Sequence, residues 1–375
     1  MRVLHIYSGN LYGGIETMLV TLAREREVCP QMEPHFALCF EGRLSEELSS
    51  ADVPVHQLGN VRASRPATVL HARNTLRKLL RSLDFDAAIC HAPWSQAIFG
   101  AVVREAGVPL IFWMHGTTDG RHWAERWARR TPPDLAICNS RFTASTLNNL
   151  YPRVRAEVLF YPVAFAPSHN SEDERRATRA ELDTPEDTTV IIQVSRMEAW
   201  KGHTLHLEAL THLRDVPGWV CWLVGGAQRP QEIQYLAELK ETVMRSGLAE
   251  RVRFLGERSD IPRLLAAADI HCQPNIQPEP FGITFIEALN ARLPVVTTAM
   301  GGAQEIIDDS CGILVPPGDA GKLSSALNKL LADKGLRVLL GETGRVRAHT
   351  LCDPARQMKH LHSALVSLAQ LEMAG

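Results

Sequence analysis

The segment Glu279-Pro-Phe-Gly-Ile-Thr-Phe-Ile-Glu287 follows the apolar run Ile270–Gln273 and precedes a second apolar run, Pro294–Thr298. Gly282, in its middle, can adopt backbone conformations that other residues avoid, so it permits a tight turn into a helix. Short apolar runs on either side of a helix-length segment are typical of parallel strands joined by a crossover helix. The segment therefore predicts one βαβ unit of an α/β fold with a parallel sheet.

The same alternation extends outward from this unit along the whole chain. In the second half, the expected strands are Val190–Val194, Val220–Val224, Val252–Leu255, Ile270–Gln273, Pro294–Thr298 and Gly312–Val315. In the first half, they are Val3–Tyr7, His35–Phe40, Val53–Leu58, Ala87–Cys90, Leu110–Met114, Leu135–Cys138 and Glu157–Phe160. Each half predicts a doubly wound, Rossmann-like sheet, and such sheets bind ligands at the carboxyl ends of their strands. We therefore expect the active site in an interdomain cleft.

Chain length and a polar stretch indicate the domains. The 375 residues exceed the length at which one hydrophobic core keeps growing, so two domains are expected. The stretch Ser168–Thr189 is rich in charge, which is typical of an interdomain connection or a surface helix. We place the N-terminal domain at residues 1–165 and the C-terminal domain at residues 166–350. Residues 351–375 have apolar residues near helical spacing and predict a closing helix that packs back toward the N-terminal domain.

Composition excludes several classes of protein. With 40 basic and 42 acidic residues the chain is nearly neutral, which argues against nucleic acid as a partner. The eight cysteines form no CxxC pair and mostly lie in apolar runs, so we interpret them as reduced core residues. The start of the chain lacks the features of a signal peptide, and no apolar stretch approaches transmembrane length. We therefore expect a cytoplasmic protein.

Two glutamates and a helix start make the quoted segment a candidate ligand site. The first N–H groups of the helix, near Ile283 and Thr284, can face an anion such as a diphosphate. Glu279 precedes the turn and can reach a sugar ring, whereas Glu287 lies about a turn into the helix and can accept hydrogen bonds from ribose hydroxyls. In the alternative interpretation, one acid complements the helix macrodipole and the other lies on a solvated face.

Motifs around the segment favour the ligand site. The segment resembles the E-x7-E signature of family 4 glycosyltransferases. It is followed by Thr298-Ala-Met-Gly301-Gly302-Ala-Gln-Glu305 and by Gly312-Ile-Leu-Val-Pro-Pro-Gly318-Asp319, which resemble the GG-x-x-E and G-x-L-v-x-p-g-D elements of that family. The resemblance covers nearly the whole second domain. It implies the GT-B architecture of two Rossmann-like domains and transfer of a hexose from a nucleotide sugar with retention at the anomeric carbon.

A further element of the family lies upstream. Ser195-Arg196-Met-Glu-Ala-Trp-Lys201-Gly202 follows a predicted strand and resembles the K-G element of family 4. A site that releases a nucleoside diphosphate must stabilise the negative charge that grows on the leaving phosphate, and two cations can do so without metal. We therefore assign Arg196 and Lys201 to the diphosphate. The alternative is that both are solvated loop cations.

The resemblance also implies the other donor contacts. Glu287 would hold the ribose, Glu279 would orient the sugar as a catalytic residue, and the backbone around Leu255 would face the base. The remaining donor-binding residues, at the helix start, would be Phe281, Gly282, Ile283 and Thr284.

The first domain carries candidates after two of its strands. Gly13 and Gly14 lie where a helix begins, and adjacent glycines there allow close backbone approach to a phosphate or simply a tight turn. His115 follows the strand Leu110–Met114 and would project from its carboxyl end; alone it is equally a core or capping histidine. Family 4 members carry a glycine loop facing the donor and a histidine near the transferred sugar at these places. The resemblance therefore implies donor contacts for both glycines and a catalytic role for His115.

No metal or other cofactor is expected. Asp84-Phe-Asp86 matches the DxD metal motif of a different glycosyltransferase fold, but it opens a predicted strand rather than ending one. His203 and His206 lie three residues apart on a predicted helix, but no third ligand has a matching spacing. We therefore predict a metal-independent site.

Two basic segments bear on membrane contact. Residues 71–83 are basic and amphipathic, and residues 121–130 combine arginines with Trp123 and Trp127. Such segments either dock on anionic lipid or form the solvated faces of ordinary helices, and both interpretations stay open. The first predicts peripheral attachment at the inner face of a membrane.

The preferred hypothesis is a retaining hexosyltransferase that uses a UDP- or GDP-sugar donor and an unknown hydroxyl acceptor in glycan, glycolipid or small-molecule glycoside synthesis. One alternative is a sugar-nucleotide epimerase of the same fold. Another is a non-catalytic nucleotide-sugar sensor, which the combined presence of both glutamates, both cations and the histidine disfavours.

Overall fold

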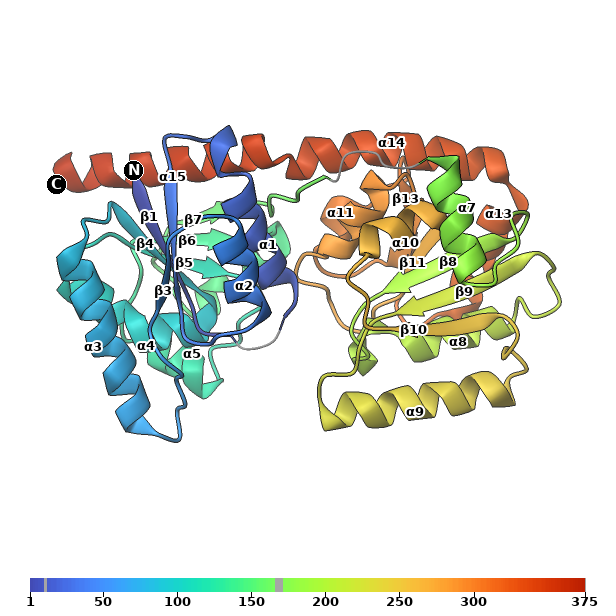
Figure 1. The fold of residues 1–375 in the computed structure, drawn as a ribbon, viewed down its shortest axis with the longest axis horizontal. Helices are drawn as coiled ribbons and strands as arrows, with labels where there is room; N and C mark the ends of the chain where they lie inside the picture. Colours follow the sequence, from blue (N-terminus) through green and yellow to red (C-terminus); the bar gives the residue numbers. More distant parts are fainter. Residues whose placement is uncertain (10–11, 166–170, 375) are drawn as a thin grey trace. The chain divides into compact units, whose positions relative to one another are not determined.

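The computed structural model describes residues 1–9, 12–165 and 171–374. The chain divides into an N-terminal unit, Met1–Ala164 with Cys352–Gly375, and a C-terminal unit, Phe165–Leu351. Each unit holds a parallel sheet flanked by helices, which confirms the two Rossmann-like sheets expected from the alternation (Figure 1).

The sheet of the N-terminal unit follows the predicted strands closely. Its strands are β1 (Arg2–Tyr7), β2 (Glu33–Leu38), β3 (Val55–Gln57), β4 (Ala87–His91), β5 (Leu110–Met114), β6 (Leu135–Cys138) and β7 (Ala156–Val158). They pair in parallel in the order β3-β2-β1-β4-β5-β6-β7. The chain winds outward from the β1–β4 pair in both directions, so the carboxyl ends of these strands lie at a topological switch point, where sheets of this type bind ligands.

Helices and short 3-10 turns connect these strands. They are α1 (Gly14–Arg24), η1 (Arg26–Val28), α2 (Arg43–Ser50), α3 (Pro66–Ser82), α4 (Ala92–Glu105), α5 (Trp123–Ala128), α6 (Arg141–Thr146) and η2 (Leu147–Asn149). The last helix, α15 (Pro354–Ala374), comes from the far end of the chain and packs on α1 and η1. Met358 and Leu361 are buried on its inner side, and His360 Nε2 lies 3.0 Å from Glu157 Oε1.

The C-terminal unit repeats the architecture. Its strands are β8 (Thr189–Val194), β9 (Trp219–Val224), β10 (Val252–Gly256), β11 (Ile270–Gln273), β12 (Val295–Thr298) and β13 (Gly312–Val315), in the parallel order β10-β9-β8-β11-β12-β13. Its helices are α7 (Glu172–Glu181), η3 (Ala199–Lys201), α8 (His203–Thr211), α9 (Pro230–Arg245), α10 (Ile261–Ala267), α11 (Ile283–Asn290), α12 (Ala303–Ile306), α13 (Ala320–Ala332) and α14 (Lys334–Cys352).

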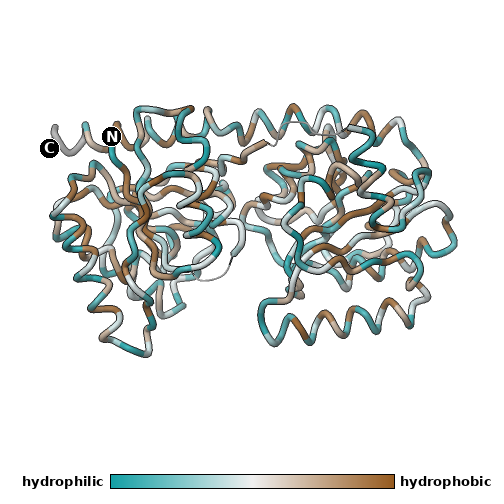
Figure 2. The backbone as a smooth tube through the Cα atoms, viewed as in Figure 1, coloured by the Kyte–Doolittle hydropathy of each residue, from teal (hydrophilic) through white to brown (hydrophobic). Residues whose placement is uncertain are grey.

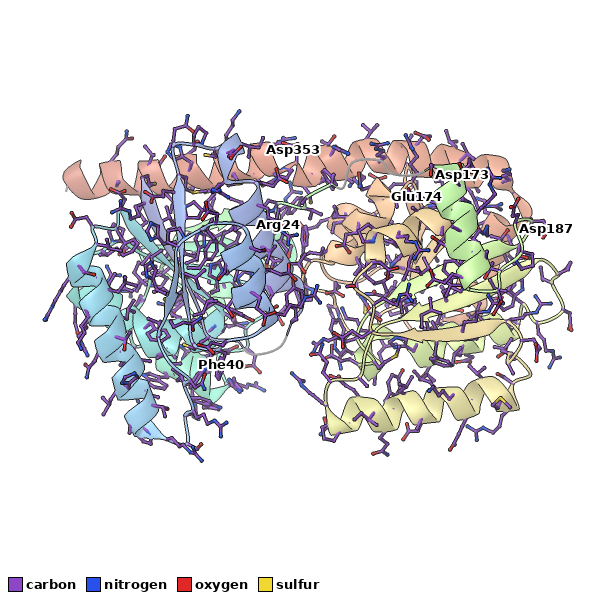
Figure 3. The ribbon with its side chains drawn as sticks, viewed as in Figure 1. Arg24, Phe40, Asp173, Glu174, Asp187 and Asp353 are labelled. Carbon is purple, nitrogen blue, oxygen red and sulfur yellow. The ribbon has the colours of Figure 1, made fainter. Side chains whose placement is uncertain are left out.

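The polar stretch predicted near the domain boundary contains α7. Ser171 caps the helix, since its side chain accepts a hydrogen bond from the backbone N–H of Glu174. Asp173 and Glu174 lie in its first turn, where acidic side chains complement the helix dipole (Figure 3). The first residues of the stretch, 168–170, lie outside the described residues.

Strand ends differ from the predictions where pairing outweighs hydrophobicity. The strand predicted at His35–Phe40 is β2, Glu33–Leu38. Arg2 of β1 pairs with Glu33, and Tyr7 pairs with Leu38, so the length of β1 sets the ends of β2. β12 begins at Val295 rather than at Pro294, and proline has no N–H to donate to the ladder.

Apolar residues concentrate along the strands of each sheet, brown in Figure 2. The largest buried side chains include Trp113 in the N-terminal unit and Trp219 and Trp222 in the C-terminal unit. All eight cysteines are buried free thiols, as their apolar surroundings predict. None of the described helices combines the length and the apolar character needed to cross a bilayer.

Candidate active site

In the C-terminal unit, three adjacent strands end in the loops that carry the predicted donor site. β8, β11 and β12 are neighbours in the sheet, and they lead into Ser195–Gly202, Pro274–Gly282 and Ala299–Gly302, respectively. The carboxyl ends of parallel strands share one edge of a sheet. Ile276 N donates to Trp200 O at 2.9 Å, which ties the first two loops together.

Lys201 and Glu279, 78 residues apart in sequence, form an ion pair at this edge. Lys201 Nζ donates to Glu279 Oε2 at 2.6 Å, and the side chains are 16% and 10% exposed. The same oxygen accepts from Asn275 Nδ2 at 3.1 Å and from Gln273 Nε2 at 3.4 Å. The other oxygen, Oε1, has no hydrogen bond to a described residue. One carboxylate oxygen is thus held by protein while the other is able to accept from a ligand hydroxyl.

Two glycines pack closely against the backbone around Glu279. Gly302 N donates to Glu279 O at 2.7 Å, and Gly301 forms a bridge with Glu279. A Cβ at Gly301, whose φ is +61°, would lie 2.4 Å from Glu279 O, and a Cβ at Gly302 would lie 2.6 Å from Pro280 O. Any side chain here would therefore displace the loop that carries Glu279, which explains the paired glycines physically.

Gly202 likewise allows close packing of the loop that carries Lys201. Its φ is +76°, and a Cβ would lie 1.7 Å from Pro274 O, so the loop after Lys201 packs directly on the loop after β11. Gln193 Nε2 also donates to Lys201 O at 3.0 Å. Both contacts fix the backbone from which Lys201 reaches Glu279.

The helix start predicted at Gly282 is observed. Gly282 has φ +103°, and α11 begins at Ile283. The first N–H groups of a helix lack intrahelical partners and carry partial positive charge, so those of Ile283 and Thr284 are suited to an anion. The side chains of Phe281 and Ile283 are buried, so these two residues can offer a ligand only their backbone. Thr284 Oγ1 is directed instead to Gln273 Oε1, at 3.4 Å.

Glu287 lies one turn into α11 and is half-buried. Burial raises the pKa of its carboxyl group to about 7. Its carboxylate has no hydrogen bond or ion pair with the residues that the structure describes. A carboxylate without protein partners is suited to accept hydrogen bonds from hydroxyl groups, which are neutral donors.

Arg196, at the end of β8, is engaged in a network of its own. Arg196 Nη2 lies 2.9 Å from Glu198 Oε1, and Nη1 lies 3.8 Å from Glu232 Oε1. Trp200 Nε1 donates to Glu198 Oε2 at 3.0 Å, and the ring of Trp200 lies 3.8 Å from Lys201 Nζ. Glu198 and Trp200 therefore link the two predicted diphosphate cations, although sequence reasoning singled out neither. Trp200, an aromatic residue beside the predicted lysine, was the available signal.

Leu255 lies on β10, at the edge of the sheet and away from β8 and β11. The register of β10 against β9 shifts between Phe254 and Gly256. Such a bulge leaves the extra residue out of the ladder. The backbone of Leu255 is therefore suited to hydrogen bonds with a planar heterocycle.

In the N-terminal unit, Gly13 and Gly14 lie at the start of α1. Gly13 N donates to Glu16 Oε2 at 2.8 Å, and Tyr7 OH donates to Glu16 Oε1. The buried carboxylate of Glu16 thus occupies the N–H that Gly13 would offer to a phosphate. The loop predicted here also includes Asn10 and Leu11, which lie outside the described residues.

His115 follows β5 and is 9% exposed. Its Nδ1 lies 2.5 Å from Tyr161 OH, and its Nε2 lies 2.9 Å from His91 Nδ1. Burial lowers the pKa of His115 to about 3, so the ring is neutral at neutral pH. A sugar hydroxyl would have to replace one of these partners. Sequence reasoning missed His91 and Tyr161, although a histidine ending an apolar strand was a signal for the first.

Other polar residues that the sequence singled out form structural hydrogen bonds. Asp86, the second acid of the DxD match, accepts a hydrogen bond from Arg2 N through Oδ2 at 2.5 Å, so it links the start of β4 to the start of β1. His206 Nδ1 lies 2.8 Å from Gln193 Oε1, and His203 Nε2 lies 3.2 Å from Ser195 Oγ. Among the described residues, no group of three or more potential ligands could hold a metal ion.

The sequence matches two families of glycosyltransferases. Residues 174–347 match Glycosyl transferases group 1, and residues 12–163 match Glycosyltransferase Family 4. The lipopolysaccharide core biosynthesis glycosyltransferase LpsE of Rhizobium meliloti (strain 1021) is 35% identical over 168 residues, 44% of this chain and 46% of that protein. The phosphatidyl-myo-inositol mannosyltransferase of Mycobacterium leprae (strain TN) is 26% identical over 338 residues, 88% of this chain and 87% of that protein. The chain thus spans about half the length of the first relative and most of the second.

The fold is similar to that of Anabaena HepE, whose crystal structure is in complex with UDP and glucose. The TM-score is 0.85 at 24% identity, and the likeness covers 98% of this chain and 100% of that chain. It concerns the fold alone and confirms the expected GT-B architecture.

Proposed function

Because the chain belongs to the family 4 glycosyltransferases, enzymes of the GT-B fold that use nucleotide sugars, we propose that it transfers a hexose to a hydroxyl acceptor. We propose further that the donor is a UDP- or GDP-sugar and that transfer proceeds with retention and without metal. The observation that carries the proposal is the Lys201–Glu279 pair beside the start of α11. It places a cation, backbone N–H groups and a carboxylate oxygen at one edge of one sheet.

The proposed reaction breaks the bond between the anomeric carbon and the diphosphate oxygen. Negative charge then grows on the leaving phosphate, where Lys201, Arg196 and the first N–H groups of α11 stabilise it. The acceptor oxygen bonds to the same face of the anomeric carbon, and its proton passes to an oxygen of the leaving phosphate. No protein base and no metal ion are needed in this scheme.

Other residues bind the donor without taking part in bond changes. Glu279 accepts from a sugar hydroxyl through Oε1, and Glu287 accepts from the ribose. The backbone of Leu255 faces the base. For His115 we propose contact with a hydroxyl of the transferred sugar, and for Gly13 and Gly14 we propose close approach to the donor.

The test is turnover with sugar-labelled UDP-glucose and GDP-mannose, with and without a mixture of glycoside and lipid acceptors. We expect labelled product, of retained anomeric configuration, only when acceptor is present, and unchanged turnover after treatment with a chelator. Free sugar formed equally without acceptor would indicate the epimerase instead. Donor binding without any release would indicate a sensor, and restoration of lost activity by magnesium or manganese would overturn the metal-free scheme.

We also propose that the N-terminal unit contacts anionic membranes through a basic aromatic surface. The two relatives are named for lipopolysaccharide and phosphatidylinositol substrates, which are membrane-bound lipids. Trp123 of α5 is 45% exposed, and the exposed cations near it in sequence are Arg121, Arg126, Arg129 and Arg130. Exposed tryptophan among cations suits the interface of an anionic bilayer.

Sedimentation with vesicles tests this surface. We expect binding to vesicles that contain phosphatidylglycerol, weaker binding after Trp123→Ala with Arg126→Ala, and little binding to vesicles of phosphatidylcholine alone. Met244→Ala with Arg245→Ala is the matched control, since it removes an exposed apolar residue and an exposed cation from α9 of the C-terminal unit. Equal loss in both double variants would contradict a specific surface.

A further inference from the structure

A pair of buried polar side chains contacts the loop that carries Lys201. Gln193 of β8 and His206 of α8 are both 0% exposed, and His206 Nδ1 lies 2.8 Å from Gln193 Oε1. On its other side, Gln193 Nε2 donates to Lys201 O at 3.0 Å. The pair therefore connects the inside of α8 to the backbone of the lysine that we assign to the diphosphate.

The path of the chain explains why these residues meet. β8 ends one residue after Gln193, the loop follows, and α8 begins directly after Gly202. His206 N donates to Gly202 O at 2.9 Å, so His206 lies in the first turn of α8, a helix that packs against β11. The contacts thus belong to one strand, one loop and one helix of the C-terminal unit.

The Lys201 carbonyl fixes the direction of both hydrogen bonds. A carbonyl oxygen can only accept, so the atom of the Gln193 amide that faces it must be the nitrogen. The second hydrogen of this nitrogen is directed to Ser195 Oγ, at 3.3 Å. The amide oxygen then faces His206, and it too can only accept. His206 must therefore be protonated on Nδ1 and donate to Gln193.

Hydrophobic packing alone does not account for this pair. Burial lowers the pKa of His206 to about 3, so the ring is neutral and Nε2 is unprotonated. This nitrogen has no hydrogen-bond partner in the part of the chain that the structure describes. A buried polar atom without a partner costs free energy, which a leucine at position 206 would avoid. The pair is thus retained at a cost to stability.

The pair holds one end of the peptide group between Lys201 and Gly202. Lys201 O accepts from Gln193, and Gly202 N donates to Ala199 O at 3.1 Å. Gly202 has φ +76°, and glycine has more backbone freedom than any other residue. The two hydrogen bonds remove that freedom, so the backbone of Lys201 has a fixed position relative to β8.

A fixed backbone matters for the chemistry of this lysine. The stem of a lysine side chain is flexible, so the place of its ammonium group depends on the backbone and on its partners, here Glu279 and Trp200. Groups that stabilise a transition state must be in place before the reaction, and a displacement of about 1 Å can lower the rate about a hundredfold.

We propose that His206, acting through Gln193, is a positioning residue that holds the backbone of Lys201 in place for the diphosphate. Both side chains are fully buried, so they act on the lysine and not on the donor. This inference rests on the proposed function, in which Lys201 stabilises charge on the leaving phosphate. In the alternative, the pair only satisfies a buried carbonyl group, and its loss would lower stability without changing kcat.

The tautomer of His206 is measured directly in the full chain labelled with nitrogen-15 histidine. We expect Nδ1 to have the chemical shift of an N–H and Nε2 that of an unprotonated nitrogen, with the signals assigned by their loss in His206→Leu. A parent protein with His206 protonated at Nε2 would overturn the proposal, because Gln193 Oε1 would then have no donor.

Kinetics separate positioning from packing. We expect His206→Leu to lower kcat about two- to tenfold, the effect of one lost hydrogen bond, with the KM for donor nearly unchanged. His206→Asn places an amide nitrogen near the position of Nδ1 and should restore most of kcat. His271→Leu is the matched control, since His271 of β11 is also 0% exposed but neither ring nitrogen has a hydrogen-bond partner among the described residues. Equal losses of kcat in the two leucine variants would contradict positioning.

A double-mutant cycle shows whether the effect passes through Lys201. In the Lys201→Ala background, His206→Leu should not lower kcat further, because the side chain that it positions is absent. The same fold loss in both backgrounds would overturn the proposal. If His206→Leu does not fold, Gln193→Met provides a second variant, which retains the length of the side chain, removes the amide and should show the same dependence on Lys201.

Failure of the proposed function has a different signature. Absence of transfer by the parent protein with every donor would refute that function. Calorimetry with UDP and GDP then still tests positioning, because the terminal phosphate of a free nucleoside diphosphate carries the charge that Lys201 would stabilise. We expect His206→Leu to weaken this binding about two- to tenfold in the parent but not in Lys201→Ala. Unchanged affinity in the folded variant would refute the positioning role.

Discussion

The carboxyl edges of the two sheets have the same architecture, but one carries charged side chains where the other carries a neutral histidine. In the C-terminal unit the strands lead to an ion pair, Lys201 with Glu279, and to a second one, Arg196 with Glu198. In the N-terminal unit they lead to His115, whose partners His91 and Tyr161 are neutral. Parallel α/β sheets place ligands at this edge, but the side chains after each strand decide which chemistry is possible there.

The difference indicates that the two edges suit different chemical groups. Cationic side chains and helix N–H groups suit the diphosphate, which gains negative charge as its bond to the sugar breaks. A neutral imidazole suits sugar hydroxyls, because it can donate one hydrogen bond and accept another. Each substitution below changes one edge and leaves the other intact.

The largest effect should follow from removing charge at the C-terminal edge. Lys201→Ala should lower kcat/KM by roughly 10²- to 10³-fold, the effect of one lost donor to developing negative charge, about 2.7–4 kcal/mol. Steady-state kinetics with saturating acceptor measure it, and the thermal unfolding curve checks the fold. Lys240→Ala is the control, since Lys240 also lies over an aromatic ring, that of Phe254, in the same unit. An unchanged rate would contradict a role in catalysis and would mean that Lys201 only supports the position of Glu279.

Somewhat smaller kinetic effects should distinguish the roles of Glu279 and Glu287. Glu279→Gln should depress kcat about ten- to hundredfold, because a hydrogen bond from a hydroxyl of the reacting sugar to a charged acceptor contributes about 1.5–3 kcal/mol. Glu287→Gln should mainly raise the KM for donor, because a ribose contact is alike in the ground and transition states. Initial rates over a range of donor concentrations distinguish the two. The reverse pattern would mean that the assigned roles are exchanged.

The two edges should respond to pH in opposite directions. Burial raises the pKa of Glu287 from 4.5 to about 7, so its contribution to stability is present at low pH and is lost as pH rises through 7. Burial lowers the pKa of His115 from 6.5 to about 3, so its contribution is present above pH 6.5 and is lost as pH falls toward 3.

Urea denaturation across this pH range measures both effects. Relative to the parent, Glu287→Gln should gain on the order of 1–3 kcal/mol of unfolding free energy above pH 7 and nothing at the acid end. The parent should lose stability on acidification below the ordinary histidine range. A constant difference between Glu287→Gln and the parent at every pH would contradict the raised pKa.

The smallest loss of activity should follow from replacing Trp200, whose ring contacts Lys201. Trp200→Leu removes both the cation–π contact with Lys201 and the hydrogen bond to Glu198, and should lower kcat/KM at least about two- to fivefold, since a cation–π contact contributes about 0.5–1 kcal/mol even where it is exposed. Trp200→Phe retains the ring and should recover about half of the loss in free energy. Parallel rate measurements on the two variants decide whether the ring or the indole N–H matters.

The strands were predictable because buried parallel strands are short, nearly continuous apolar runs between turns. Leu110–Met114, Leu135–Cys138, Ile270–Gln273 and Gly312–Val315 agree with the structure at both ends. β7 was predicted at Glu157–Phe160 but is Ala156–Val158, because an edge strand ends where its single neighbour, β6, ends. Hydrophobicity alone does not contain that information.

The candidate site was predictable in its residues but not in its contacts. Motifs named Lys201 and Glu279, yet only the meeting of the β8 and β11 loops pairs them. The contacts of His91 with His5 and with His115 depend on strand order and register, which are long-range properties. His5 and His91 are polar residues within apolar strands, and this was the signal that sequence reasoning passed over.

The return of α15 to the N-terminal unit makes the order of biosynthesis relevant to folding. Strands β1 to β7 leave the ribosome before the C-terminal unit, but the helix that covers α1 and η1 and buries Met358 and Leu361 is translated after that unit. The C-terminal unit is one continuous stretch, Phe165–Leu351, and can complete its core before α15 emerges. The unit that begins folding first is therefore the last to be finished, and a nascent chain stalled before Pro354 would expose an apolar surface that chaperones recognise.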